Sequence, residues 1–468
     1  MFRQLAPVVL ASLVAVGPIA QPAAPIAAAT NMAYGDAQPI LEVLHDNLPG
    51  DLRGKTASDL QRAWPAWVSR RDAEIRARLT RGDEDSLVNF LLFGTTFTRL
   101  PRALNDSTKL GGSARAAEIV RGRMDDMADG IVSPGQNERL RFARQLVERA
   151  GIDPSAPEGL DRVRAYLRQV MTRVVGEVQQ YAREVQATRS LADPVAAFAE
   201  RSQLFRTRGL SSDTSILPDF AVDEALAAMR TSGALSANSV RNVAIVGPGL
   251  DFTDKAEGYD FYAPQTMQPF AAIDSLVRHG LANPDNLHVT TFDLSPRINR
   301  HLETARERAR ARTAYTIEVI RDAGAAWRPG LDSYWQHFGD RIGETTEGVA
   351  PPPGTGHVDV RAVAVRPSVV LLIAPQDLDI VLQRLDPLPP LQQYDLIIAT
   401  NIFVYYDAFE QALGLTNAAR MLRPGGFLLS NNALPDRLVP SITPAGSTRA
   451  IYTDRQDDGD QILWYQRR

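Results

Sequence analysis

The sequence predicts an α/β protein, with a mainly α-helical N-terminal region followed by a doubly wound, mostly parallel sheet that ends in an antiparallel hairpin. Before about residue 235, apolar residues recur every three or four positions, most clearly over 157–189, which is the spacing of one helix face. From about residue 236, short β-branched runs alternate with helical stretches. The turn signal Asp457-Asp458-Gly459 predicts the closing hairpin. We therefore expect a helical domain over 30–235 and a sheet domain over 236–468.

The expected strands are uninterrupted apolar runs, which is typical of a parallel sheet covered by helices on both faces. They fall at 243–246, 288–292, 369–373, 396–400 and 427–430, and the hairpin strands at 448–453 and 461–465. Helices are expected between them at 266–279, 295–312 and 408–422. Ser295 is suited to cap the second of these helices, and Pro296 to occupy its first position.

Composition and charge exclude several classes of function. The 468 residues carry 51 Lys and Arg against 55 Asp and Glu, a net charge of -4, so no basic excess indicates a nucleic-acid partner. The chain has no cysteine, which excludes disulfides, thiolate nucleophiles and cysteine-ligated metals. None of the six histidines lies four residues from another, so the helical HExxH site is also excluded, and we expect no metal.

The first 29 residues have the three-part layout of a secretory signal peptide. Arg3 supplies a positive charge, 5–16 is almost wholly apolar, and Ala27-Ala28-Ala29 offers small residues for cleavage. This predicts export to the periplasm or cell envelope. A cytoplasmic location is the alternative if the segment is not a signal. No later stretch reaches the roughly 18 apolar residues of a membrane span, so none is expected in the mature chain.

The candidate ligand site comes from the residues that follow each predicted strand. In a doubly wound sheet, ligands bind at the carboxyl ends of the strands, near the point where the strand order reverses. Glycines there allow a tight turn and close backbone approach, and a carboxylate can accept hydrogen bonds from a ribose diol. The residues in these positions are Gly247, Pro248 and Gly249, then Asp293 and Leu294, then Gln376 and Asp377, and finally Asn401 and Ile402.

Two further segments carry a resemblance to a known family. The stretch YDLIIATNIFVYYD at 394–407 and the stretch RMLRPGGFLL at 420–429 resemble class I, Rossmann-like S-adenosylmethionine-dependent methyltransferases. The order of glycine turn, two acidic strand ends, YDLI strand and LRPGG segment is similar as well. The resemblance covers residues 236–468, and it implies a Rossmann-like sheet and S-adenosylmethionine as cofactor.

The resemblance also implies a role for each strand-end residue. Gly247 and Gly249 would lie against the methionine portion of the cofactor, and Asp293 would bind the ribose hydroxyls. Gln376 and Asp377 would border the adenine. Asn401 and Ile402 would lie beside the methyl group. Three tyrosines, Tyr262, Tyr405 and Tyr406, are candidates for the substrate side, with core packing as their alternative role.

The sequence also departs from the family pattern. The family usually has an acidic residue two positions before the first glycine, where this chain has Ile245, and Asp251 replaces the third glycine. The predicted export signal conflicts with a cytosolic cofactor, and together with these departures it leaves two main hypotheses: a methyltransferase acting on a small-molecule or protein acceptor, or a non-catalytic exported envelope protein that retains the fold. An NAD(P)-dependent oxidoreductase is weaker, because its fingerprint requires glycine where Phe252 stands. No catalytic base and no oligomeric state are predicted.

Overall fold

The computed structural model describes residues 27–45, 48–103, 112–188, 209–253, 258–353, 355–456 and 458–468. Residues 1–26, which hold most of the predicted signal peptide, lie outside these ranges, as does Asp457 of the predicted turn. Within the described ranges, every helix is too short or too polar to serve as a membrane span.

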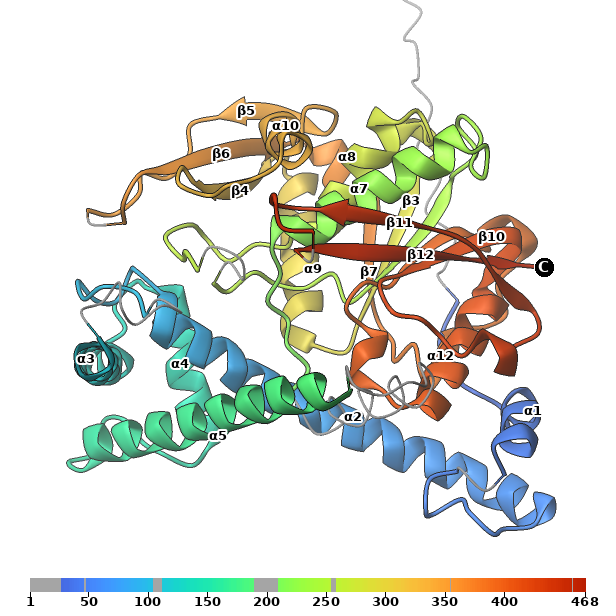
Figure 1. The fold of residues 1–468 in the computed structure, drawn as a ribbon, viewed down its shortest axis with the longest axis horizontal. Coiled ribbons are helices and arrows are strands. Elements are labelled where there is room, and N and C mark those ends of the chain that lie inside the picture. The colour runs from blue at the N-terminus through green and yellow to red at the C-terminus, as the bar shows by residue number, and fades with distance from the viewer. Residues whose placement is uncertain are drawn as a thin grey trace, which may run out of the picture.

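A seven-stranded sheet forms the centre of the C-terminal half (Figure 1). Its strand order is β11-β12-β10-β9-β2-β3-β7, in which β12 runs antiparallel to both of its neighbours and the other strands run parallel to one another. The predicted fold class, a Rossmann-like and mostly parallel sheet with an antiparallel final hairpin, is therefore confirmed. The strands are β2 (Asn242–Val246), β3 (His288–Asp293), β7 (Ile373–Asp377), β9 (Tyr394–Ile398), β10 (Leu422–Ser430), β11 (Ile442–Ile451) and β12 (Gly459–Arg467).

Helices cover both faces of this sheet because its central strands are apolar on both sides. In β2, Val243 and Ile245 pack into one core, with α7 (Ile216–Thr231), α8 (Gln268–Arg278) and α9 (Pro296–Arg310). Ala244 and Val246 point the other way, into a core with α1 (Tyr34–Leu44), α2 (Ala57–Phe93) and α12 (Ala408–Met421). The alternation follows from the two-residue period of a strand.

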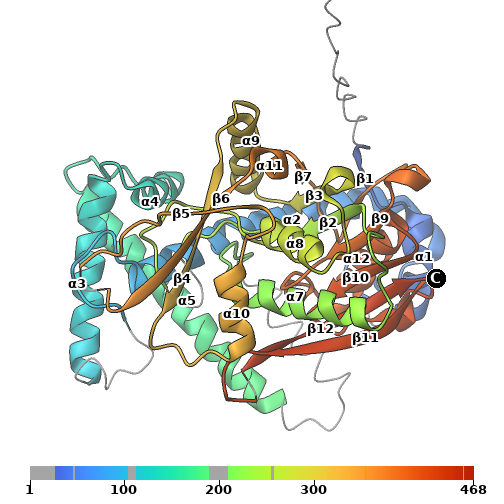
Figure 2. The same cartoon turned by 90° about the horizontal axis from the view of Figure 1, so that it is seen from above.

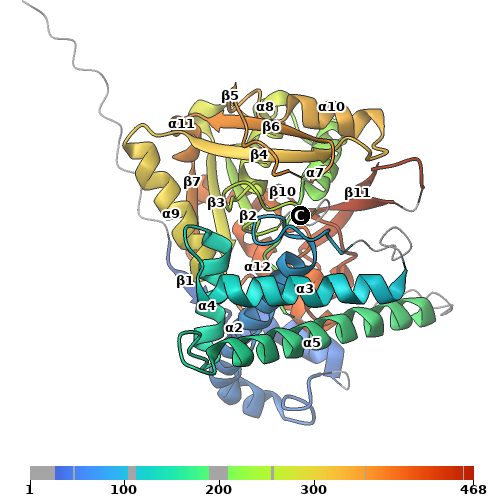
Figure 3. The ribbon, with the colours of Figure 1, turned by 90° about the vertical axis from the view of Figure 1, so that its left-hand side faces the viewer.

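The helical N-terminal region is also present. Helices α3 (Ser113–Val132), α4 (Glu138–Arg149) and α5 (Gly159–Thr188) gather around the second half of α2, below the sheet in Figure 3. Phe252, which follows the first strand of the sheet, packs into their core between Phe90 and Phe142. The helix α7 lies before the predicted boundary at 235, yet it packs along β11 and β12 and adds to the layer over the sheet (Figure 2).

The segment before β7 differs from the prediction. The expected strand at 369–373 is wrong: Pro367 begins a short helix, α11 (Pro367–Val370), and β7 forms only from Ile373. Both elements are short apolar runs, and in runs of this length the hydrophobic periodicity does not distinguish a helix from a strand. A small antiparallel sheet that the sequence did not predict precedes them, in the order β4-β6-β5. Its elements are β4 (Tyr315–Asp322), α10 (Pro329–His337), β5 (Gly343–Thr346) and β6 (Val358–Val365), and a further pair is formed by β1 (Ala29–Asn31) with β8 (Gln383–Leu385).

A buried ion pair joins the helical region to the sheet domain. The Arg71 Nε of α2 lies 2.5 Å from Glu410 Oε1 of α12, and the two side chains are only 12% and 2% exposed. Glu410 also completes a capping box with Asp407 at the start of α12, in which each residue's side chain accepts from the other's backbone N–H. The carboxylate of Glu410 therefore serves both as a helix cap and as a tether for α2.

We expect Arg71→Ala to lower the free energy of unfolding by about 3 kcal/mol, because it leaves the Glu410 charge buried without its partner. Arg70→Ala is the matched control. Its ion pair with Asp51 is half exposed, so the loss should stay below about 1 kcal/mol. Urea unfolding of the full chain measures both, and equal losses would contradict the role given to the buried pair.

Candidate functional site

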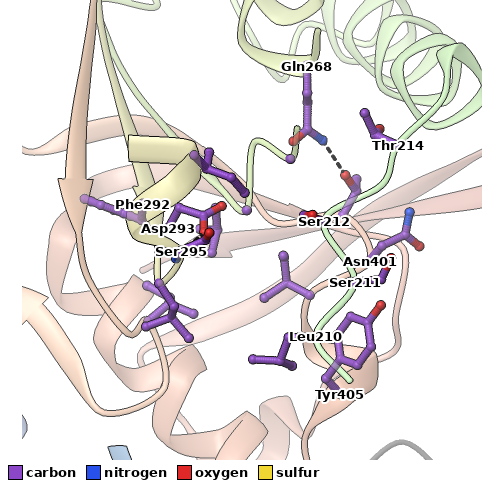
Figure 4. Close-up of a pocket in the computed structure, with 18 of the residues that line it drawn as sticks. Leu210, Ser211, Ser212, Thr214, Gln268, Phe292, Asp293, Ser295, Asn401 and Tyr405 are labelled. Atoms are coloured by element: carbon purple, nitrogen blue, oxygen red, sulfur yellow. Dashed lines mark hydrogen bonds between the residues drawn. The ribbon is translucent and has the colours of Figure 1, made fainter. Parts of the chain in front are cut away.

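A cavity opens at the carboxyl ends of β2, β3, β7 and β9. The chain passes from β2 outward to β3 and β7 on one side and to β9 and β10 on the other, so the strand order reverses between β2 and β9. This is the position at which doubly wound sheets bind their ligands. Figure 4 shows residues from several strand ends pointing into this space.

The turn after β2 forms one end of the cavity. Gly247 and Gly249 both line it and both have positive φ, +65° and +71°. A Cβ at Gly247 would come within 2.3 Å of the Ile402 side chain, and one at Gly249 within 2.8 Å of the Ser212 carbonyl oxygen. Glycine is therefore required at both positions by backbone conformation and by space. Pro248 is buried between them and is not among the residues that line the cavity.

Asp293 is the last residue of β3 and lines the cavity together with Leu294. The carboxylate is 8% exposed, and its Oδ1 accepts a hydrogen bond of 2.7 Å from the Ser295 N–H. Burial raises the pKa of Asp293 to about 7, although this hydrogen bond and Arg297 both favour the charged form. The backbone N–H fixes one carboxylate oxygen in place within a partly dry site.

A second buried carboxylate comes from the loop after β7. Asp379 is 1% exposed, and its Oδ1 accepts from the Val381 N–H at 2.9 Å. Its Oδ2 is buried without a hydrogen-bond partner among the described residues, and Asp379 lines the cavity between Leu378 and Ile380. Burial raises the pKa of this group to about 7. An unpartnered buried carboxylate oxygen calls for a donor, and a ligand in the cavity could supply it.

The predicted residues of this loop, Gln376 and Asp377, do not line the cavity. They are still part of β7, where they pair with Phe292 and Asp293 of β3. The Asp377 side chain is 54% exposed and forms an ion pair of 2.8 Å with Arg76 of α2. The strand begins and ends about four residues later than predicted, so the strand-end position falls on Leu378–Ile380.

The turn after β9 supplies the other predicted residues. Asn401 has a positive φ of +58°, unusual for a residue other than glycine. Its N–H donates to Asn431 Oδ1 at 2.8 Å, and its own Oδ1 accepts from Asn431 Nδ2 at 2.5 Å. Asn401, Ile402, Tyr405 and Tyr406 all line the cavity. Tyr262 does not, because its hydroxyl donates to Asp251 Oδ2 at 2.7 Å in a separate buried cluster.

Two elements that the sequence did not point to complete the cavity. Leu79 reaches the cavity from α2. Residues 210–215, which we call the strap segment, run across the cavity. The strap segment is held at its start and near its middle: Leu210 N–H donates to the Arg78 carbonyl at 3.2 Å, and the Ser212 carbonyl accepts from Leu250 N–H at 3.0 Å. Gln268 and Thr400, joined by a hydrogen bond of 2.7 Å, also line the wall (Figure 4).

The two departures from the family pattern lie away from the cavity. Ile245 is fully buried in the core with α7 and α8. Asp251 is 1% exposed and faces Tyr262 and Gln265. No carboxylate therefore stands at the usual acidic position. In the part of the chain that the structure describes, no three His, Asp or Glu side chains are grouped as metal ligands.

The chain has similarity to known proteins among solved structures but not at the level of sequence. No protein-family model and no curated protein sequence matches the chain. Among solved structures it is similar to TrmN from Thermus thermophilus, at 13% identity over 54% of this chain and 52% of that one, with a TM-score of 0.26. It is similar to human N-acetylserotonin methyltransferase, crystallised with S-adenosylmethionine, at 12% identity over 88% and 98%, with a TM-score of 0.24.

A third similar structure is the O-methyltransferase NcsB1 from neocarzinostatin biosynthesis, at 10% identity over 85% of this chain and 96% of that one, with a TM-score of 0.27. The chain spans about half the length of TrmN. The assignment of the fold rests on the strand order of the sheet.

The close contact between α2 and the strap segment can be tested at Gly82. A Cβ there would meet the Leu210 carbonyl oxygen at 1.9 Å, so Gly82→Ala must displace the strap segment. We expect a loss of about 1–3 kcal/mol in unfolding free energy. Gly176→Ala, at an exposed helical glycine of α5 with no atom within 4 Å, should instead be neutral or stabilise by up to about 1 kcal/mol. Denaturant unfolding would contradict the contact if both variants behaved alike.

Proposed function

We propose that the protein is an S-adenosylmethionine-dependent methyltransferase that transfers a methyl group to a small-molecule or protein acceptor. One observation carries the proposal: a glycine turn and two buried carboxylates, from three successive parallel strands, face one cavity at the reversal of strand order. A nucleoside ligand offers donors to both carboxylates, namely a ribose diol and an exocyclic amine.

The residues fit such a ligand in order along the cavity. The Asp293 carboxylate would accept from the ribose hydroxyls, with its other oxygen held by Ser295 N–H. Asp379, in place of Asp377, would accept from the adenine amine at its unpartnered Oδ2. Gly247 and Gly249 would leave room for the methionine portion, and Asn401 and Ile402 would border its reactive end.

When bound, S-adenosylmethionine supplies a methyl group on a positively charged sulfur; an acceptor would bond to the methyl carbon from the side opposite the sulfur, which leaves as a neutral thioether. The chain's own contribution would be to align the acceptor and to exclude water, and alignment alone can account for much of a rate enhancement. Leu79 and the strap segment cover the cavity on one side. Burial holds the pKa of Tyr406 well above its ordinary value, so this hydroxyl would stay protonated and could orient an acceptor without removing a proton.

Calorimetric titration of S-adenosylmethionine into the full chain tests the proposal. We expect micromolar binding that Asp293→Ala weakens at least about tenfold, because a charge-assisted pair of hydrogen bonds to the diol is lost. Asp285→Ala, which removes an exposed carboxylate before β3, serves as the control and should bind as the parent chain does. Absence of binding up to millimolar concentration in a folded sample would refute the proposal.

The choice of Asp379 over Asp377 gives a separate expectation. In Asp379→Asn, the side-chain oxygen can still accept from Val381 N–H, but the amide then presents a donor to the adenine amine. Affinity for S-adenosylmethionine should fall by about tenfold. In Asp377→Asn, only a surface ion pair with Arg76 is lost, and affinity should change less than about threefold. The same titration measures both, and the reverse order would restore Asp377 as the adenine-side residue.

A further inference from the structure

A second and larger groove adjoins the cavity and shares Leu79 and Ser295 with it. The groove lies between α4 and α9, which Figure 3 shows next to one another, and encloses about 1170 Å³. Phe142 and Phe252 line it, together with Ala263 and Pro264 from the loop before α8. None of the functions discussed above uses this space.

The groove is rich in arginine because two helices turn their basic faces toward it. On α9, the lining residues recur every three or four positions, which places them on one helix face: Arg297, Arg300, His301, Thr304 and Arg308. On α4, Arg141 and Arg149 line the opposite wall. The start of α9, at Ser295 and Pro296, also faces the groove and adds the partial positive charge of a helix N-terminus.

The carboxylates of the groove do not balance these charges. Two of the lining residues already have counter-ions that do not line the groove. Arg76 pairs with Asp72 and Asp377, and Glu148 pairs with Arg144. Five arginines then face two carboxylates, Asp83 and Glu138. Asp83 is shared between Arg149, at 3.4 Å, and Arg297, at 3.6 Å.

Three of the arginines are available to a ligand. Arg141 donates only to neutral acceptors, the Gly135 carbonyl at 2.9 Å and Gln136 Oε1 at 2.7 Å. Arg300 and Arg308 are exposed and form no ion pair with any carboxylate of the described residues. Exposed arginines are common on helices, but these two also line a groove whose opposite wall is a second basic helix.

Arg297 is fixed where the groove meets the cavity. Its guanidinium lies 4.1 Å from the centre of the Phe142 ring and donates to Ser212 Oγ of the strap segment at 3.1 Å. Its Nε is buried without a hydrogen-bond partner among the described residues. A stacked guanidinium is already oriented, so little entropy is lost when it binds an anion.

The positive charges of the groove also affect the pKa of the nearby His301. The pKa of His301 is lowered to about 4, first by burial and then by repulsion from Arg297 and Arg308. The ring is therefore neutral at physiological pH and shares a hydrogen bond of 2.8 Å with the Tyr315 hydroxyl.

We propose that this groove is a second ligand site, which binds a small anion carrying several phosphate or carboxylate groups between Arg141, Arg300 and Arg308. Guanidinium groups pair with both kinds of oxyanion in two-pronged geometry, which a neutral ligand could not use. The aromatic and apolar residues of the groove would cover the uncharged part of the ligand. The site does not depend on the proposed methyl transfer, because none of these three arginines lines the cavity of the glycine turn.

The test uses tripolyphosphate as the phosphate probe and citrate as the carboxylate probe, titrated into the full chain at low salt. At least one should bind, and added NaCl should weaken the binding. The double variant Arg300→Gln with Arg308→Gln should lower the affinity at least about tenfold, since two charged hydrogen-bond donors are lost. The ratio of the two affinities in the parent chain then indicates which oxyanion the site prefers.

The matched control is Arg310→Gln with Arg312→Gln, which removes the same charge from two exposed positions, the last residue of α9 and one just beyond it, that do not line the groove. It should retain the affinity of the parent chain within about twofold. Equal losses in both double variants, or no binding of either probe at millimolar concentration to folded protein, would overturn the proposal. Titration of S-adenosylmethionine into the same samples tests the methyltransferase proposal independently, so a failure of one proposal can be distinguished from a failure of the other.

Discussion

The path of α2 across the carboxyl edge of the sheet is the constraint on which the site depends. Over the turns between Arg71 and Asp83, about 18 Å of helix, four of its side chains form polar contacts with the sheet domain. In chain order the contacts are Arg71 with Glu410, Arg76 with Asp377, Arg78 Nη2 with the Tyr405 carbonyl at 3.0 Å, and Asp83 with Arg297. A rigid helix held at several points along this edge cannot tilt away at one point without breaking contacts at the others.

Burial sets the electrostatics of the cavity beside this helix. Asp293 and Asp379 have raised pKa values chiefly because burial removes water from their carboxylates. Each keeps one oxygen anchored by a backbone N–H, so the orientation of the group is set before any ligand arrives. A ligand that donates to the remaining oxygen would replace the missing water, which favours ligands with hydroxyl or amino groups at these two points.

Sequence patterns located the parts of the site that depend on local structure. The rule that ligand residues follow strand ends placed Gly247, Gly249, Asp293 and Asn401 at the cavity, because their strands begin and end close to the predicted positions. It failed after β7, where Pro367 starts a helix in an apolar run and moves the strand end to Asp377. Leu79 and the strap segment could not be found in this way, because their contacts join residues far apart in sequence and leave no local pattern.

Arg297 would link the two proposed sites electrostatically. Its positive charge favours the ionised form of Asp293 at the cavity, while its guanidinium faces the groove. An anion held in the groove would offset part of that charge and make Asp293 harder to ionise. A cofactor that needs the Asp293 carboxylate would then bind less tightly, and thermodynamic linkage requires that the bound cofactor weaken the anion to the same degree. The strap segment belongs to the same connection, because Ser212 accepts from Arg297 and its carbonyl holds the backbone beside the glycine turn.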